Sequence, residues 1–171
     1  QSDITAACLE GMMTKFVIGE ERGEVSIHDY QSGRKLAQFT GPSDGAKKMT
    51  VVDLRYIPSP NSVLVGYLNG SLRIYDISSL SLSFEFKTES IYRDLPKLNM
   101  LCMDYVKMES QSGLVASIGL NRGDILFLWD VDIGRLEMKI KMGDYKINAM
   151  TFLEPYPLLA MPCFLSRSKC A

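Results

Sequence analysis

The sequence predicts an all-β protein made of about three and a half four-stranded antiparallel units. A motif of alternating apolar residues, ending in an aromatic residue or histidine followed by aspartate, recurs along the chain. The runs around it are short, rich in Val, Ile, Phe and Tyr, and separated by Ser-Gly, Asn-Gly and proline-containing turns, as strands and hairpins are. A repeat period of about 20 to 50 residues indicates a repeat architecture. Because the repeated runs have the features of strands, we expect strands in every unit and no helix.

The recurring motif ends at Asp29, Asp76 and Asp130, with spacings of 47 residues (29 to 76) and 54 residues (76 to 130). Its copies read Gly-Glu-Val-Ser-Ile-His-Asp, Gly-Ser-Leu-Arg-Ile-Tyr-Asp and Ile-Leu-Phe-Leu-Trp-Asp. Alternation with a period of two predicts a strand in each copy. We expect this strand to be the third of its unit, because two strand-like runs precede each copy and one follows it.

The first run of each unit has apolar residues at its first, fourth and sixth positions. These residues are Ile4, Ala7 and Leu9; Val51, Leu54 and Tyr56; Met100, Met103 and Tyr105; and Ile147, Met150 and Phe152. The second run is short and apolar, and in three units it ends in glycine, at Gly19, Gly66 and Gly119. We expect the methionines in these columns to fill the core.

Three units are complete and a fourth is broken. We place the complete units at residues 3–40, 50–87 and 99–141, a partial unit at 146–161 and a divergent tail at 162–171. The tail has no glycine, no alternation and no aromatic-aspartate pair. This loss of pattern leaves open that the chain is a truncated product of a larger protein without a stable function of its own.

The motif dipeptides are Trp-Asp at 129–130, Tyr-Asp at 75–76 and His-Asp at 28–29. With these dipeptides in a four-stranded repeat, the chain resembles the WD-repeat β-propeller family along nearly its whole length. The resemblance implies a partial WD-repeat β-propeller whose units are blades, and a non-catalytic scaffold that mediates protein–protein assembly. The Gly-His pair that opens a repeat in this family is absent, so the family's Asp-His-Ser-Trp hydrogen-bond network is not expected here.

A propeller of three and a half blades is incomplete, since closed propellers have about 4 to 8 blades. Two broad apolar blade faces are left uncovered, and uncovered apolar faces predict association. We therefore expect either the remainder of the propeller, in a longer parent chain, or a second copy of this chain to cover them.

The charge balance disfavours two classes of partner. The chain has 19 Lys and Arg against 20 Asp and Glu, and no basic block longer than Lys47-Lys48. Without a basic surface we expect neither nucleic acid nor an anionic membrane as a partner. The remaining class of partner is other proteins.

Two features predict the location of the protein. No apolar run approaches the roughly 20 residues that cross a bilayer, and the first residues lack the charged and apolar regions of a signal peptide, so we expect a cytoplasmic protein. The hairpin at residues 154–159, within 147–161, resembles a segment of WD-repeat proteins of the axoneme, which implies a cilium or flagellum.

The chain lacks the residue patterns of a metal or catalytic site. The four cysteines, at positions 8, 102, 163 and 170, are scattered, which excludes a C-x-x-C zinc site and indicates a reducing compartment with Cys8 and Cys102 as small buried hydrophobes. Residues 130–134 fail as a calcium loop because Arg135 stands where an EF-hand needs glycine. His28 is alone and is expected to be a packed strand residue.

We therefore expect no catalytic residue, no metal and no cofactor. An enzyme stays open only if a missing remainder of the protein supplies catalytic groups.

Candidate binding residues lie in the loops that join fourth to first and second to third strands, where the family resemblance implies that partners dock. Tyr and Arg are the residue types that dominate binding hot spots. The candidates at these loops are Tyr67, Tyr92, Arg93, Arg122 and Tyr145.

Overall fold

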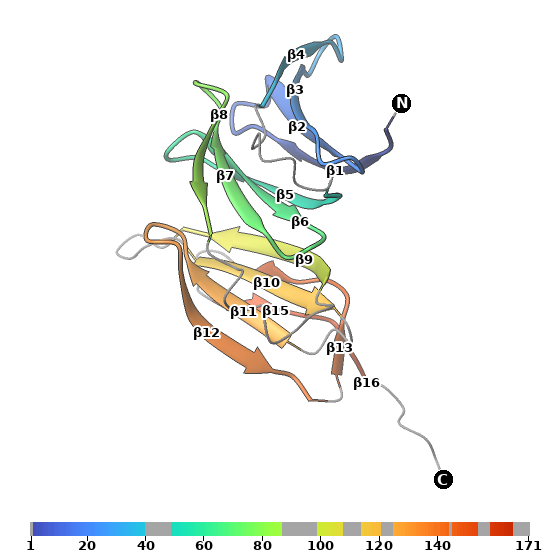
Figure 1. Ribbon diagram of the computed structural model, residues 1–171, viewed down its shortest axis with the longest axis vertical. Coiled ribbons are helices and arrows are strands. Elements are labelled where there is room, and N and C mark those ends of the chain that lie inside the picture. Colours follow the sequence, from blue (N-terminus) through green and yellow to red (C-terminus); the bar gives the residue numbers. More distant parts are fainter. Residues whose placement is uncertain are drawn as a thin grey trace. The chain divides into compact units, whose positions relative to one another are not determined.

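The computed structural model describes residues 2–39, 49–86, 99–107, 114–120, 125–143, 145–153 and 158–165 (Figure 1). These residues form strands and turns, and no helix occurs among them, which confirms the all-β prediction. Within this part of the chain there is accordingly no helix of membrane-spanning length and hydropathy. The chain divides into two compact units, residues 1–88 and 89–171, and we describe each unit by itself.

The first unit contains two four-stranded antiparallel sheets (Figure 1). The first sheet consists of β1 (Ile4–Leu9), β2 (Lys15–Glu20), β3 (Val25–Asp29) and β4 (Lys35–Gln38). The second sheet consists of β5 (Val51–Ile57), β6 (Ser62–Tyr67), β7 (Leu72–Asp76) and β8 (Ser81–Glu85). In both sheets the spatial order of the strands is their order in the chain, so every neighbouring pair is a hairpin.

The second unit begins with a third sheet of the same kind. It consists of β9 (Asn99–Val106), β10 (Leu114–Leu120), β11 (Ile125–Asp130) and β12 (Arg135–Lys141), again in chain order. Four-stranded antiparallel sheets that follow one another along the chain are consistent with a partial β-propeller. The prediction that methionines in the apolar columns fill the core is confirmed in the second unit, where Met100, Met103 and Met150 are buried.

The end of the chain has a strand that the sequence does not predict. The short strands β14 (Thr151–Phe152) and β15 (Leu159–Ala160) pair with each other. Strand β13 (Tyr145–Ile147) pairs with β16 (Cys163–Leu165), which lies inside the expected divergent tail. Pairing uses backbone N–H and C=O groups, so a three-residue strand can form without the side-chain alternation by which sequence patterns reveal strands.

The motif aspartates close the turn between the third and fourth strands. The Oδ1 atom of Asp29 accepts a hydrogen bond from the Ser32 N–H at 2.8 Å, and Asp76 accepts one from the Ser79 N–H at 2.6 Å. Asp130 does the same with the Ile133 N–H at 3.2 Å. A short carboxylate side chain that binds its own turn explains why aspartate recurs at this point of the repeat.

These turns give the fold a dependence on acid pH. The hydrogen bonds of Ser32 lower the pKa of the Asp29 carboxyl below 3.8, and those of Ser79 lower the pKa of Asp76 in the same way. The unfolded chain takes up these protons at higher pH than the folded chain. The stabilisation is therefore complete above about pH 4 and is lost as the pH falls through the lowered pKa values.

The double variant Asp29→Asn, Asp76→Asn tests this dependence. We expect the difference in melting temperature between the unaltered chain and the variant to be largest above about pH 4 and to shrink in acid. Thermal melts followed by circular dichroism measure it. A difference of the same size at about pH 2.5 and about pH 6 would contradict the role of these carboxylates.

The core of the first unit lies between its two sheets. Strands β1 and β2 pack on β5. The first sheet contributes Val17, Val25, Ile27 and Phe39, and the second sheet contributes Val51, Leu54, Val63, Val65, Tyr67, Tyr75 and Ile77. The rings of Phe39 and Tyr75 join the two sets, with centroids 5.2 Å apart. This apolar contact holds the two sheets together.

The packing of the two sheets explains the glycine at position 19, which ends the second run of the first repeat. A Cβ atom on Gly19 would overlap Cγ1 of Val51 and lie 2.8 Å from its Cβ. The backbone of β2 can approach β5 this closely only because residue 19 has no side chain.

Candidate protein-interaction surface

Tyr67 is not the exposed loop residue that the sequence predicts. It is the last residue of β6 and is only 3% exposed. Its hydroxyl lies 3.1 Å from that of Tyr75, and burial raises the pKa of the Tyr67 phenol. The strand continues one residue beyond Gly66, so alternation turns the ring onto the face that the first sheet covers. Tyr67 stabilises the sheet packing and does not offer its ring to a partner.

Arg73 of β7 is a buried cation that sequence reasoning missed. It is 5% exposed, its guanidinium lies 5.1 Å from the centre of the Tyr67 ring, and its Nε donates to Glu85 Oε1 at 2.8 Å. The signal in the sequence was a charged residue between Leu72 and Ile74 in an otherwise apolar strand. Burial with a carboxylate partner makes it a structural residue.

The other candidates divide into two groups. Tyr92, Arg93 and Arg122 lie outside the residues that the structure describes. Tyr145 is the first residue of β13 and is 45% exposed. Of the five candidates, Tyr145 is the one that the described part of the chain shows at the surface.

An exposed apolar patch lies at one end of the first sheet, where sequence reasoning did not place a site. Its residues, here called the turn patch, are Leu9, Met12, Met13 and Tyr30, with exposed fractions of 48%, 79%, 67% and 58%. The β1–β2 turn and the β3–β4 turn meet there, because the Tyr30 N–H donates to the Thr14 carbonyl at 3.0 Å. The available signal was a pair of methionines inside a predicted turn, away from the core columns.

His28 confirms the expectation of a packed strand residue. It is half-buried on β3, and its ring stacks on Phe16 with centroids 5.3 Å apart. Its Nδ1 lies 3.1 Å from the Gly33 carbonyl and its Nε2 lies 3.0 Å from Ser26 Oγ. A carbonyl oxygen can only accept, so Nδ1–H donates to it. No group of three or more His, Cys, Asp or Glu side chains that could hold a metal is found in the described ranges.

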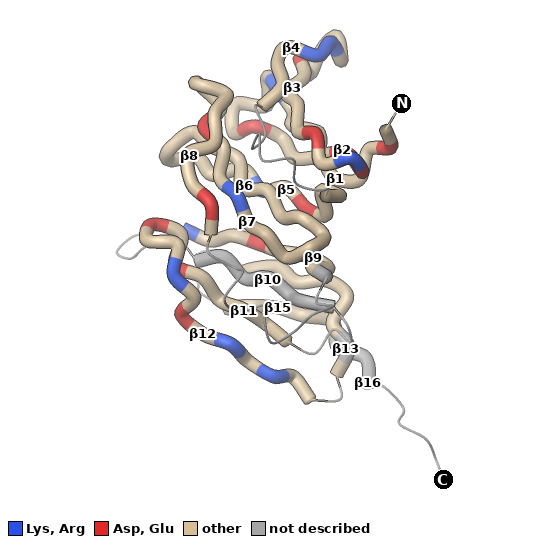
Figure 2. The backbone as a smooth tube through the Cα atoms, in the orientation of Figure 1, with Lys and Arg blue, Asp and Glu red and all other residues tan. Residues whose placement is uncertain are grey.

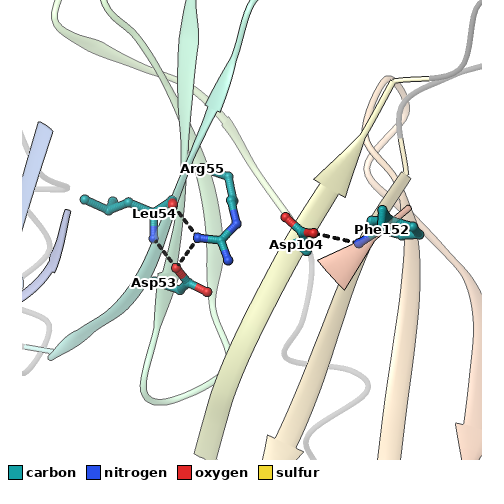
Figure 3. Close-up of polar contacts among 5 residues, drawn as sticks. All are labelled: Asp53, Leu54, Arg55, Asp104 and Phe152. Atoms are coloured by element: carbon teal, nitrogen blue, oxygen red, sulfur yellow. Dashed lines mark hydrogen bonds and ion pairs between the residues drawn. The ribbon is translucent and has the colours of Figure 1, made fainter. Parts of the chain in front are cut away.

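Charged residues on the first strand of the second sheet are paired locally (Figure 3). Asp53 Oδ1 accepts from the Arg55 guanidinium at 2.6 Å and from the Leu54 N–H at 2.9 Å. Arg55 also donates to the Leu54 carbonyl. Figure 2 shows acidic and basic residues interspersed along the described strands.

Cys8, which the sequence predicts to be a small buried hydrophobe, is half-buried. Desolvation still raises the pKa of its thiol to about 12, against the opposing charge of Arg55. A thiol with this pKa stays protonated at neutral pH and is a poor nucleophile.

In the second unit, a carboxylate joins the third sheet to the strands that follow it (Figure 3). Asp104 Oδ2 of β9 accepts a hydrogen bond from the Phe152 N–H of β14 at 2.8 Å. A charged acceptor strengthens such a bond. Its length and partial burial indicate that Asp104 holds β14 against the third sheet.

Replacing Asp104 by alanine tests this contact. We expect Asp104→Ala to destabilise the chain by about 1 kcal/mol more than Asp104→Asn, because the amide oxygen of asparagine can still accept the bond. Denaturant unfolding measures the difference. Equal effects of the two variants would show that the hydrogen bond contributes nothing.

Comparison with known proteins finds sequence similarity to a WD-repeat protein. No protein-family model matches the chain. The chain is 28% identical over 145 residues to Protein DWD HYPERSENSITIVE TO UV-B 1 of Arabidopsis thaliana, and the match covers 84% of this chain and 18% of that relative. The chain thus spans less than a fifth of the length of the relative that it matches. This similarity suggests the same family as the motif dipeptides do.

Proposed function

We propose that the chain is a WD-repeat scaffold that binds other proteins and carries out no reaction itself. The observation that supports this most is the series of four-stranded sheets, each with a motif aspartate in its last turn, in a chain similar to a WD-repeat protein. Stiff sheets hold turn side chains in fixed positions, which lowers the entropy cost of binding.

The turn patch is the surface we assign to this function. Its methionines are flexible and polarizable and adapt to different partners, and Tyr30 adds a rigid aromatic anchor. The four side chains are exposed on turns that a backbone hydrogen bond ties together. Tyr145, in the second unit, is a further exposed residue of the type that binding sites favour.

Affinity capture with two matched variants tests the proposal. We expect the unaltered chain to enrich a set of proteins that Met12→Glu, Met13→Glu loses, because two carboxylates would have to be desolvated in the interface. The control is Gln38→Glu, Ser83→Glu, which adds the same charge at two exposed strand positions and should keep the set. Enrichment of no protein by the unaltered chain, or equal capture by both variants, would contradict the proposal.

A cytoplasmic location in a cilium or flagellum is a separate proposal. It is supported by the resemblance of residues 147–161 to axonemal WD-repeat proteins, and residues 154–157 of that segment lie outside the described residues. Immunofluorescence should then stain the axoneme. Staining confined to other structures would rule the proposal out.

A further inference from the structure

The backbone of the β1–β2 turn is strained at one of the two methionines of the turn patch. Met13 has a φ of 55°, in the left-handed region that is unfavourable for a residue with a Cβ atom. Among the described residues, Leu80 is the one other non-glycine residue with a positive φ, at 56°. Leu80 packs against the core of the first unit, so the burial of apolar surface offsets its strain. Met13 is 67% exposed and gains no such burial, which indicates a role of this side chain outside the fold.

The turn is held in place by groups other than the two methionine side chains. The Glu10 carbonyl accepts a hydrogen bond from the Met13 N–H at 2.8 Å, and the buried Glu10 carboxylate accepts one from the Thr14 hydroxyl at 3.1 Å. Gly11 lies against the second sheet, where a Cβ atom on it would be 2.6 Å from Cε1 of Tyr56. A chemical change at the two methionine sulfur atoms therefore leaves the contacts that fix the turn unchanged.

Methionine differs from the other apolar residues because its thioether sulfur can be oxidised. Met12 and Met13 are 79% and 67% exposed, and they are the only adjacent methionines of the sequence. The core methionines of the second unit, Met100, Met103 and Met150, are at most 6% exposed. A dissolved oxidant reaches an exposed sulfur in the folded chain, but it reaches a buried sulfur only when the fold opens locally.

Cys8, on the strand that leads into this turn, competes poorly for the same oxidant. Peroxides react with the thiolate form of cysteine, and burial raises the pKa of the Cys8 thiol to about 12. At pH 7 about one such thiol in 10⁵ is ionised. A thioether has no proton to lose, so it needs no ionisation in order to react. We therefore expect hydrogen peroxide at neutral pH to oxidise the methionines of the turn patch before it oxidises Cys8.

We propose that Met12 and Met13 form a reversible oxidation site that switches off binding at the turn patch. Each sulfur takes one oxygen atom from hydrogen peroxide, so that the sulfur is oxidised by two electrons to the sulfoxide and the peroxide is reduced to water. A methionine sulfoxide reductase reverses the step with a dithiol, which supplies two electrons and two protons, becomes a disulfide and releases the oxygen as water. This inference rests on the proposed binding function and names its regulation.

Oxidation opposes binding because a sulfoxide is polar where the thioether is apolar. An interface on the turn patch would remove the sulfoxide oxygens from water, which is unfavourable unless the partner donates a hydrogen bond to each of them. We expect the affinity to fall about tenfold or more when both sulfurs are oxidised. Leucine has a similar volume and no oxidisable atom, so leucine at both positions keeps the apolar surface and removes the switch. The φ of Leu80 shows that leucine adopts the backbone conformation required at position 13.

The test compares three chains before and after oxidation. The first is unaltered, and the second, here called the leucine chain, carries Met12→Leu and Met13→Leu. The control carries Met138→Leu, which removes a methionine of β12 that is 51% exposed and lies outside the turn patch. Each chain is treated with hydrogen peroxide, the peroxide is destroyed with catalase, and affinity capture from extract of the source cells follows. Peptide-resolved mass spectrometry measures the oxidation of each methionine, and circular dichroism measures whether the fold is retained.

We expect the two methionines of the turn patch to be oxidised about tenfold faster, or faster still, than Met100, Met103 and Met150, with the fold retained. Oxidation should reduce capture by the unaltered chain and by the Met138→Leu chain about tenfold or more. Methionine sulfoxide reductase with dithiothreitol should restore it. The leucine chain should capture the same proteins as the untreated, unaltered chain, both before and after treatment with peroxide.

Capture that oxidation of the unaltered chain leaves unchanged would overturn the switch and leave the binding function standing. The same holds if the leucine chain does not bind or stays sensitive to peroxide, or if the Met138→Leu chain loses its sensitivity. Unfolding of the oxidised chain would also overturn the switch, since binding would then be lost with the fold. If the untreated chain captures no protein, the binding function itself fails and the switch fails with it.

Discussion

Replacing Trp129 by alanine is expected to lower the free energy of unfolding by about 3–5 kcal/mol. Trp129 lies in β11 of the third sheet, is 1% exposed and is the largest fully buried side chain of the described residues. Its removal takes away the transfer free energy of a large apolar group and leaves a cavity that the neighbouring side chains fill only in part. The loss should therefore exceed that of any other substitution discussed above.

The matched control for this variant is Tyr30→Ala, which removes an aromatic ring that is 58% exposed. We expect its effect on stability to stay within about 0.5 kcal/mol, as for other surface changes. Both variants are measured by denaturant unfolding followed by circular dichroism, because Trp129 is the chain's one tryptophan and its fluorescence is lost with it. A Trp129→Ala variant as stable as the unaltered chain would show that the third sheet is wrongly assigned.

Gly19→Val is expected to destabilise the first unit by about 1–3 kcal/mol, which is the usual cost of overpacking a core. The new side chain would enter the space held by Val51, so β2 and β5 could no longer approach each other. Ala7→Val is the control, because it adds side-chain volume to the same sheet at an exposed position. It should change stability by less than about 0.5 kcal/mol.

A double-mutant cycle tests whether Gly19→Val destabilises the chain through overlap with Val51. Val51→Ala alone costs stability because it opens a cavity in the core. Combined with Gly19→Val it should cost less than the sum of the two single changes, since the added and removed carbons occupy the same space. We expect a coupling of about 0.5–3 kcal/mol. Additive effects would show that Gly19 is required for a reason other than the approach of Val51.

The all-β fold could be predicted from the sequence because successive side chains of a strand point to opposite faces of its sheet. Where the two faces have different surroundings, the residue types alternate with a period of two. The motif aspartates could be predicted as repeat markers for a local reason, since each binds its own turn. Strand β16 could not be predicted, because backbone pairing of three residues leaves no side-chain pattern.

The candidate site was less predictable, for reasons that particular residues show. Tyr67 follows the glycine at which the apolar run ends, so only the packing of the first sheet on the second reveals that its strand continues into the core. Methionine is a residue type that commonly fills cores, so its identity does not predict exposure at positions 12 and 13. Met12 and Met13 are exposed because they lie in the turn between β1 and β2. The exposure of Ile4 depends on which side of the first sheet packs on the second sheet, and no local pattern expresses this.

Site-specific photo-crosslinking tests the scaffold function most directly. A photoreactive phenylalanine analogue replaces Met12 in the turn patch, and in the matched protein it replaces Ser83, an exposed residue of β8. After irradiation in extract of the source cells, we expect covalent adducts with other proteins from position 12 and none of these adducts from position 83. The same adducts from both positions, or no adduct from position 12, would contradict a protein-binding role for this surface.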